Sequence, residues 1–211
     1  MKIITLEEVE STHTHLKELI KKDGFSYPIC ITTTFQTKGI GSRGNSWQGK
    51  KGNLFFSFVL KKDDLPKDLE LQSASIFFSL ILKNELATQG SNLWLKWPND
   101  FYLEDKKIGG TITTATKDLV FCGIGLNLIE VDFEFGKLDI NIDIEQTLKR
   151  YFENIKKQQS WKQIFSQFKI EFQRSKKFKT TVNNKKISLQ DAILNDDGSI
   201  QIDNTRVFSL R

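Results

Sequence analysis

A single lysine interrupts the apolar segment LWLKW, which runs from Leu93 to Trp97. If this segment forms a strand, its side chains alternate between two faces, so Lys96 points away from Leu95 and Trp97. A core lysine without a partner is costly, so its face should border a cleft. At about 4 Å from a phosphate or carboxylate, with an effective dielectric near 20, a lysine contributes roughly 4 kcal/mol. Lys96 is thus a candidate for stabilising a charged transition state; the alternative is an exposed lysine on a half-buried strand.

The second candidate is a glycine-rich loop from Gln36 to Asn53, which directly follows an apolar stretch. Glycines at positions 39, 41 and 44 leave backbone N–H groups open to an anion or a ligand carbonyl, and Arg43 adds a fixed positive charge. Trp47 needs a packing partner, which closure of the loop over a ligand would supply. The loop lacks the Gly-Lys-Ser/Thr ending of a P-loop, and a strand rather than a helix follows it, unlike a dinucleotide fingerprint. The alternative is an ordinary surface loop.

A third candidate lies at the end of an apolar stretch, in the sequence FCGIGLN. Gly123 and Gly125 would let a flat ligand lie against the strand backbone. Asn127 can both donate and accept hydrogen bonds, as reading a purine edge or orienting a phosphate requires. A bulged strand without a ligand explains the pattern equally well.

Hydrophobic periodicity and turn signals indicate which elements carry these residues. A first helix is predicted to start at Ser11 or Thr12 and to end at Gly24. Strands are predicted at 28–36, 54–60, 92–97, 100–116 and 118–128, with a tight turn at Glu104-Asp105. Helical patterns cover 67–90 and 142–177, and the first of these is almost wholly apolar.

The last 35 or so residues have a different pattern, with short alternating segments and turn signals at Asn183-Asn184 and Asp197-Gly198. The sequence therefore predicts two domains: a main part at 1–175, which carries the candidate residues above, and a small β unit at 176–211. The expected class is α+β, with a mixed β-sheet, packed helices and a small β-barrel-like unit at the C-terminus. A chain of 211 residues has room for one sizeable core and a small appended unit.

Composition excludes several classes of protein. A hydrophobic content of 38%, with 17 Phe and 4 Trp, excludes disorder. No apolar run is long enough to cross a bilayer, and the N-terminus lacks the apolar stretch of a signal peptide, so we expect a cytoplasmic protein. Cys30 and Cys122 lie in apolar contexts and are expected to be buried free thiols. A net charge of +5 suits anionic partners without choosing among them.

The inventory of reactive groups is also informative. No Ser-His-Asp or Cys-His arrangement can be nominated, and no group of acids and histidines has the spacing of metal ligands. Chemistry that depends on positioning and electrostatics alone would fit this inventory.

Four segments in order resemble the biotin protein ligases: ESTHTHLKEL, FQTKGIGSRGNSWQGKKGNLFFSFVL, LKWPNDFYLEDKKIGG and GIGLN. The resemblance covers about Glu10 to Asn127. It implies an enzyme that activates biotin with ATP as biotinyl-5′-AMP, releases pyrophosphate, and transfers biotin to a lysine of a biotin carboxyl carrier protein. Mg²⁺ would arrive with ATP, held mostly by phosphate oxygens and by no dedicated protein ligands.

The resemblance also implies roles for individual residues. Lys96 and Arg43 match catalytic positions, with Lys96 neutralising charge on the biotin carboxylate and the α-phosphate. Positions that match biotin-binding residues are Ser11, Thr12, His13, Gln36, Gly39, Ile40, Gly41, Ser42, Lys96 and Gly110, with Ser11, Thr12 and Gln36 at the ureido group. Positions that match ATP- or adenylate-binding residues are Arg43, Trp47, Asn99, Gly123, Gly125 and Asn127.

The chain departs from the family pattern in the loop, where Ile40, Ser42 and Asn45 stand at positions often taken by arginine. We therefore expect a weaker grip on the adenylate, unless Lys38 or Lys50 compensates. His13 stands where the family usually has asparagine.

Because the Ser-Thr pair begins at position 11, we expect no N-terminal DNA-binding domain and no specific DNA binding. A homodimer formed by pairing of sheet edges is plausible. Two other functions remain open. One is a lipoate-type protein ligase, whose arginine-rich and glycine-triplet motifs are missing here. The other is a non-catalytic protein that binds biotin or a nucleotide.

Overall fold

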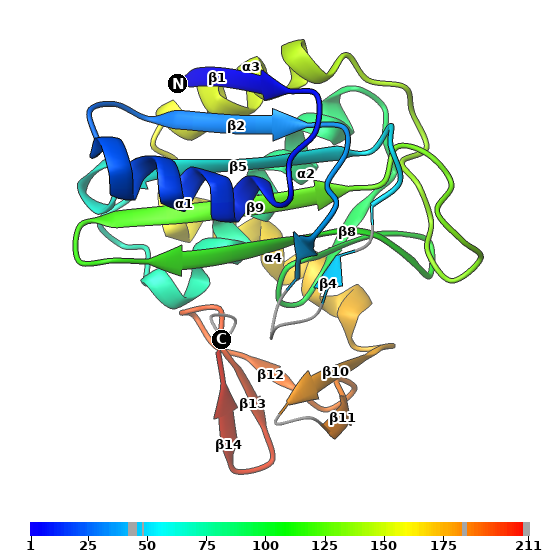
Figure 1. The fold of residues 1–211 in the computed structure, drawn as a ribbon. Coiled ribbons are helices and arrows are strands. Elements are labelled where there is room, and N and C mark those ends of the chain that lie inside the picture. Colours follow the sequence, from blue (N-terminus) through cyan, green and yellow to red (C-terminus); the bar gives the residue numbers. More distant parts are fainter. Residues whose placement is uncertain (42–45, 48, 183–184, 209–211) are drawn as a thin grey trace.

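The computed structural model describes residues 1–41, 46–47, 49–182 and 185–208. Its centre is a seven-stranded mixed sheet with the order β1-β2-β5-β9-β8-β7-β6 (Figure 1). The strands, in that order, are Lys2–Leu6, Ile29–Thr33, Leu54–Lys61, Leu119–Leu126, Lys106–Ala115, Asp100–Leu103 and Trp94–Lys96. All neighbouring pairs are antiparallel except β1 and β2.

The edge strand β1 is the element that sequence patterns missed. It pairs in parallel with β2, so that Lys2 lies opposite Ile29 and Leu6 opposite Thr33. Its sequence, KIITL, is β-branched and alternating, which is a strand signal, but five residues next to a chain end carry little weight without a pairing partner. The remaining predicted strands of this sheet are confirmed, with bounds that differ by a few residues.

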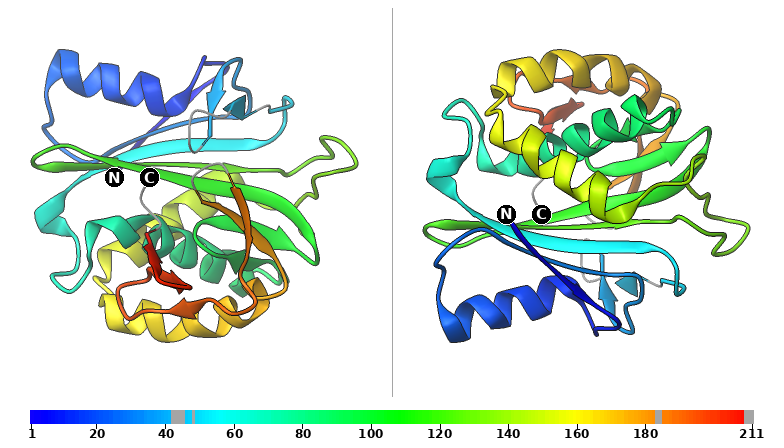
Figure 2. Two further views of the ribbon diagram at one scale, coloured as in Figure 1. Left: turned by 90° about the horizontal axis from the view of Figure 1, so that it is seen from below. Right: turned by 90° about the horizontal axis from the view of Figure 1, so that it is seen from above.

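The helices form two layers, one on each side of the sheet (Figure 2). Helix α1 (Thr12–Asp23) covers one face, and α2 (Ala74–Thr88), α3 (Ile144–Lys156) and α4 (Trp161–Ser175) cover the other. The predicted ends of α1 are confirmed: the Ser11 side chain accepts a hydrogen bond from the Thr14 N–H, and Gly24 has φ of +76°. Short 3-10 turns at Lys62–Asp64 and Leu71–Ser73 precede α2.

Helix α2 is apolar on nearly all sides because it lies between the sheet and helices α3 and α4. Much of the core around it is aromatic. The Phe58 ring contacts the Phe78 ring edge-on, with centroids 5.0 Å apart, and the Phe152 ring at 5.3 Å. Part of the high phenylalanine content of the sequence is thus explained by an aromatic core between β5, α2 and α3.

The C-terminal segment forms two small antiparallel sheets, within the described residues. One contains β10 (Lys179–Val182) and β11 (Lys185–Ser188); the other contains β12 (Ile193–Leu194), β13 (Ile200–Ile202) and β14 (Thr205–Val207). Residues 183–184, a predicted turn, lie outside the described residues, whereas Gly198 has the predicted turn conformation, with φ of +81°. The Trp97 indole N–H donates to Gly198 O at 2.9 Å, and Val182, Ile200 and Val207 belong to the main core cluster. The unit is therefore packed onto the sheet and its helices.

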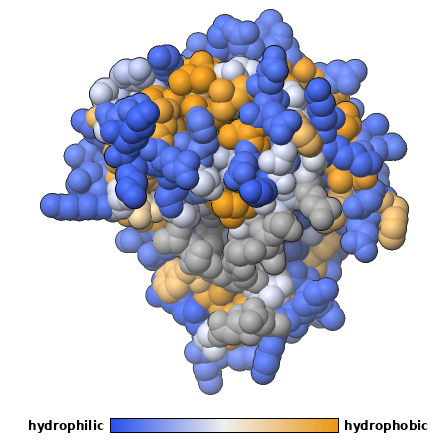
Figure 3. Space-filling model, in the orientation of Figure 1, coloured by the Kyte–Doolittle hydropathy of each residue, from blue (hydrophilic) through white to orange (hydrophobic). Residues whose placement is uncertain are grey.

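The surface in the view of Figure 1 is mostly hydrophilic, with hydrophobic residues showing over the β1–β2 end of the sheet (Figure 3). No helix in the described part of the chain combines the length and the apolar character needed to cross a bilayer.

The edge strand β6 is covered by side chains of α4 rather than by another strand. The Glu171 carboxylate accepts a hydrogen bond from the Leu95 N–H at 3.0 Å, and the Ser175 hydroxyl accepts one from the Trp97 N–H at 2.9 Å. Glu171 also forms an ion pair with Lys83 at 2.9 Å, and both side chains are largely buried. These contacts hold the strand that carries Lys96.

Replacing Glu171 by alanine should destabilise the fold by about 3 kcal/mol, because it leaves Lys83 buried without its counter-charge and the Leu95 N–H without its acceptor. Urea unfolding of the variant measures the change. Lys149→Ala is the control, because the Lys149–Glu145 pair is exposed and its loss should have no measurable effect. Equal stabilities of the two variants would contradict this role of Glu171.

Candidate active site

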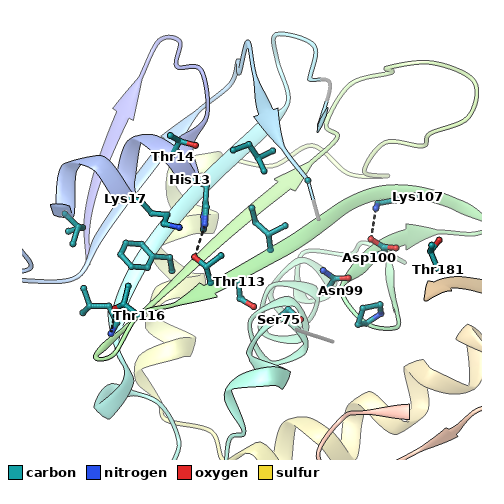
Figure 4. Close-up of a pocket in the computed structure, with 18 of the residues that line it drawn as sticks. His13, Thr14, Lys17, Ser75, Asn99, Asp100, Lys107, Thr113, Thr116 and Thr181 are labelled. Carbon is teal, nitrogen blue, oxygen red and sulfur yellow. Dashed lines mark hydrogen bonds and ion pairs between the residues drawn. The ribbon is translucent and has the colours of Figure 1, made fainter. Parts of the chain in front are cut away.

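Two adjoining cavities lie beside α1, and the larger one also reaches the start of α2 and strand β10 of the C-terminal unit. The smaller has a volume of about 220 Å³ and the larger about 820 Å³. They share His13, Gly41, Asn99, Asp100 and Lys107 in their walls, so they adjoin at these residues. Figure 4 shows residues that line the larger cavity. The larger volume is in the range of small-molecule sites, roughly 300–1,000 Å³.

The small cavity has a polar end beside the start of α1. Both the backbone N–H and the hydroxyl of Thr12 donate to Gln36 Oε1, at 2.7 and 3.0 Å. The Thr12 hydroxyl also lies 2.9 Å from the Ser57 hydroxyl of β5. All three side chains are buried, so this cluster is a fixed set of donors and acceptors rather than a solvated surface.

Gln36 reaches this position because the backbone at Gly39 passes very close to both Trp47 and the Gln36 side chain. A Cβ added at Gly39 would lie 2.5 Å from Trp47 O and 2.9 Å from Gln36 Nε2, so only glycine fits. Gly39 and Trp47 pair as the short strands β3 (Gly39–Ile40) and β4 (Ser46–Trp47). The glycine-rich loop is thus a small hairpin over the cavity in its described part; Ser42, Arg43 and Asn45 lie outside the described residues.

The floor of the small cavity is made of glycines on two neighbouring strands. Gly110 of β8 pairs with Gly125 of β9. A Cβ at Gly125 would lie 3.1 Å from the Trp47 ring, and one at Gly123 would lie 3.2 Å from His13 Nδ1. These glycines allow Trp47 and His13 to approach the strand backbone, in the place where the sequence predicts a flat ligand. The indole N–H of Trp47 is buried and has no partner among the described residues.

Lys96 forms part of the wall of the large cavity. It is 6% exposed, whereas Leu95 and Trp97 are fully buried in the core, so the alternative of an exposed lysine is wrong. Its Nζ lies 3.7 Å from Asp100 Oδ2 and 5.3 Å from the centre of the Tyr102 ring. Asp100 Oδ1 in turn lies 2.6 Å from Lys107 Nζ, so one carboxylate holds two lysines at the junction of the cavities.

His13 lies between the two cavities and faces them both. Its Nε2 lies 3.2 Å from the Thr114 hydroxyl, and its Nδ1 is buried without a partner in the described part of the chain. Burial, with a smaller contribution from the nearby Lys17, lowers the pKa of His13 to about 4. The ring is therefore neutral at physiological pH.

Asn99 and Asn127, the two predicted asparagines, differ in their positions. Asn99 lines both cavities, and its side-chain amide donates to the Thr111 carbonyl. Asn127 lines neither cavity; its amide donates to Gly136 O at 3.1 Å and so holds the segment that follows β9. The Oδ1 of Asn127 is buried without a partner among the described residues.

The sequence analysis assigned some residues to biotin and others to the nucleotide. The two cavities do not separate the residues in this way. Trp47, Gly123 and Gly125 were assigned to the nucleotide, yet they line the small cavity together with Thr12 and Gln36. Sequence patterns alone could not place them, because the cavity forms only when β4, β8 and β9 come together.

Several lining residues were missed by the sequence analysis: Ser57, Ser75, Asp100, Lys107 and Thr111. A signal existed for two of them. Ser57 is a lone polar residue in the apolar run LFFSFVL, and Asp100 closes the WPND segment.

The described residues contain no cluster of three or more histidines, cysteines, aspartates or glutamates that could hold a metal ion. The charged groups of the large cavity are mainly lysines, at positions 17, 21, 96, 107 and 179, with the carboxylates of Glu18 and Asp100. The site is thus built for an anion.

The titration of His13 predicts how stability depends on pH. Its pKa is about 4 in the folded protein, below the ordinary value of 6.5, so protonation favours the unfolded chain. The stabilisation is complete above pH 6.5 and is lost as the pH falls towards 4, with a slope of at most about 1.4 kcal/mol per unit. Urea unfolding at a series of pH values should show a shallower slope for His13→Asn; parallel curves would contradict the assigned pKa.

Replacing each of two neighbouring glycines in β8 by alanine should change the stability of the fold by different amounts. A Cβ at Gly109 would lie 2.6 Å from the backbone Gly125 O, whereas one at Gly110 would make only ordinary contacts of 3.4 Å or more. Gly109→Ala should destabilise the fold by about 1–3 kcal/mol, because β8 and β9 must separate. Gly110→Ala is the matched control, and its unfolding free energy should stay close to that of the wild type.

Comparison with known proteins agrees with this geometry. Residues 5–127 match the Biotin/lipoate A/B protein ligase family. The crystal structure of biotin acetyl coenzyme A carboxylase synthetase from Helicobacter pylori, with bound biotinylated ATP, has a TM-score of 0.93 and 36% identity, covering 98% of this chain and 99% of that one. Biotin protein ligase from Aquifex aeolicus, in complex with biotin and ATP, has a TM-score of 0.73 and 28% identity, covering 100% and 98%.

Among curated proteins, biotin–protein ligase 2 of Arabidopsis thaliana is 36% identical over 110 residues, which are 47% of this chain and 32% of that protein. The chain thus matches about a third of the length of that relative. The family match covers more than half of the chain, and the sheet and helices agree with the ligase structures over almost their whole length. The chain belongs to the biotin/lipoate A/B protein ligase family.

Proposed function

We propose that this chain is an ATP-dependent biotin–protein ligase that forms biotinyl-5′-AMP and transfers the biotinyl group to a lysine of a biotin carboxyl carrier protein. The observation that carries the proposal is the junction of two cavities. One ends in the buried Thr12–Gln36–Ser57 cluster, the other is lined with lysines, and Lys96, Asp100 and Lys107 lie where they meet. The likeness to the Helicobacter pylori protein, solved with biotinylated ATP, supports it.

The small cavity is assigned to the bicyclic ring of biotin. A ureido group has one carbonyl acceptor and two N–H donors, and each needs a partner once it is buried. The hydroxyls of Thr12 and Ser57 and the carboxamide of Gln36 supply both kinds of partner at the polar end of the cavity. Trp47 and the strand backbone at Gly125 enclose the flat ring system.

This polar end also distinguishes the proposal from a lipoate ligase, the other activity within the family. The dithiolane ring of lipoate has no group that could form strong hydrogen bonds with Thr12, Gln36 or Ser57. A ring of this kind would displace water from these side chains without replacing the hydrogen bonds of that water. Biotin is therefore the better match.

In the first reaction, a carboxylate oxygen of biotin attacks the α-phosphorus of ATP, and the bond from that phosphorus to the bridging oxygen of the β-phosphate breaks. Lys96 and Lys107 neutralise the charge that gathers on the α-phosphate. Their ammonium groups are already held by Asp100, so little reorganisation is needed when the substrates bind. Mg²⁺ enters as part of the ATP substrate, bound to phosphate oxygens, since the lining is rich in lysine.

In the second reaction, the neutral amine of the acceptor lysine attacks the carbonyl carbon of the mixed anhydride. An amide bond forms, and AMP leaves. The chain needs no covalent intermediate for this step. Its part is to bind the adenylate, to exclude water and to admit the amine, which are tasks of positioning.

The test is transfer of biotin to a carrier domain in the presence of ATP and Mg²⁺, followed by intact mass. A mass increase of one biotinyl group on the carrier lysine is the expected result. Lipoate in place of biotin should give no product. Tight biotin binding by calorimetry, without biotin-dependent ATP–pyrophosphate exchange, would instead show a non-catalytic binding protein.

Lys96→Gln should reduce biotin-dependent ATP–pyrophosphate exchange about 100-fold or more, because an electrostatic partner of the transition state is lost. The fold should survive, since glutamine keeps most of the side-chain length. Lys106→Gln is the matched control: Lys106 is exposed on β8, lines neither cavity, and should keep wild-type exchange. Near-normal exchange in Lys96→Gln would remove Lys96 from its assigned role.

A further inference from the structure

The large cavity contains a buried hydroxyl that the assignments above do not use. Ser75 lies in the first turn of α2, is 2% exposed, and is one of the residues that line the cavity. Its Oγ has no hydrogen-bond partner among the described residues. In Figure 4, Ser75 lies on α2 between Thr113 and Asn99. Leaving a buried hydroxyl unpaired is costly, so such a group points to a ligand.

The start of α2 is electrostatically suited to an anion. No acidic residue occupies its first turn, and no side chain caps its end. The aligned peptide groups of a 15-residue helix give this end a partial positive charge. A negative group beside Ser75 would therefore meet both a hydrogen-bond donor and a favourable field.

Two lysines from different parts of the chain line the same cavity. Lys96 comes from β6 and is buried, and Lys179 comes from β10 of the C-terminal unit and is exposed. The carboxylates of the lining are those of Glu18 and Asp100, and Asp100 is already held by Lys96 and Lys107. This end of the cavity can thus accept further negative charge.

We propose that Ser75, the start of α2 and Lys179 form the subsite for the leaving group of the first reaction, the β- and γ-phosphates that depart as pyrophosphate. The inference rests on the proposed function, because it assumes that ATP is the second substrate. Lys96 belongs to the α-phosphate, and the phosphate chain continues from it towards Ser75. The Ser75 hydroxyl donates to a phosphate oxygen, which carries the charge that the broken bond leaves on pyrophosphate.

This assignment gives the C-terminal unit a part in the chemistry. The unit is packed onto the rest of the chain through Trp97 and the turn at Gly198, and its strand β10 contributes Lys179 to the cavity wall. The same turn receives a hydrogen bond from Ser73, the residue that precedes α2, at Asp197 O. The start of α2 is thus joined directly to the C-terminal unit.

Calorimetric titration of magnesium pyrophosphate into the protein, with biotin present, tests the subsite. Ser75→Ala should bind pyrophosphate about tenfold more weakly, as expected for the loss of one charge-assisted hydrogen bond. Ser75→Asp should abolish measurable binding, because it adds a negative charge at the same place. Biotin affinity should remain that of the wild type in both variants.

Stability supplies a second readout. Removing an unpaired buried hydroxyl should leave the unfolding temperature of Ser75→Ala unchanged or raise it. Ser79→Ala is the matched control on the same helix: its hydroxyl lies 2.6 Å from Ser75 O and 2.7 Å from Thr111 Oγ1, so this variant should lose stability but bind pyrophosphate normally. A fall in the unfolding temperature of Ser75→Ala as large as that of Ser79→Ala would overturn the proposal.

Pyrophosphate titration also tests the role of Lys179. Lys179→Ala should weaken pyrophosphate binding severalfold, whereas Lys185→Ala, an exposed lysine of the paired strand β11, should have no effect. Equal losses in both would indicate unspecific charge attraction and would overturn the subsite, as would wild-type affinity in Ser75→Ala and Ser75→Asp. Failure of the proposed function has a different signature: the wild type would not bind biotin, while pyrophosphate titrated without biotin would still report on the anion site.

Discussion

The site depends on one carboxylate that holds two lysines in a largely buried place. Asp100 lies 3.7 Å from Lys96 Nζ and 2.6 Å from Lys107 Nζ. The sheet makes this possible, because Lys96 is opposite Asp100 in the β6–β7 pair and Asp100 is opposite Gly110 in the β7–β8 pair. A buried lysine needs a nearby negative charge, and Asp100 supplies that charge to both Lys96 and Lys107.

Glycines have a complementary role in the site, because the absence of a side chain lets neighbouring groups lie close to the backbone. Gly39 lets the loop hairpin cross over Gln36, and Gly125 lets the Trp47 ring rest on β9. Gly109 allows β8 and β9 to approach without a side chain between them. The small cavity is therefore shaped largely by backbone, whereas its polar end is shaped by side chains of α1, β5 and the loop. A ligand that fits must be flat along most of its length and polar at one end.

The strands that carry the charged groups are also supported by the elements packed against them. These elements are helices α2 and α4 and the C-terminal unit. Side chains of α4 take the free backbone donors of β6, which holds Lys96 in register. The indole of Trp97, the next residue, reaches the turn of the C-terminal unit. The positions of the charged groups are therefore coupled to the packing of the unit, and its attachment is part of the architecture of the site.

Much of this protein could be predicted from the sequence because the signals are local. The caps of α1 at Ser11 and Gly24, the apolar strands and the helical periodicities depend on neighbours a few residues away. The burial of Cys30 and Cys122 followed in the same way from their apolar context. The side of the strand on which Lys96 lies also followed, since alternation along a strand is a local property.

Tertiary structure alone decided what these residues face. His13 meets Thr114, which is 101 positions away, and Trp47 lines the small cavity together with Thr12 and Gln36. The short strand β1 acquires its place only by pairing with β2. Ser75 looks like an ordinary residue of an apolar helix until the cavity wall shows its unpaired hydroxyl. Local interactions select helices and strands, but burial and pairing arise between distant segments, and those determine the chemistry of a site.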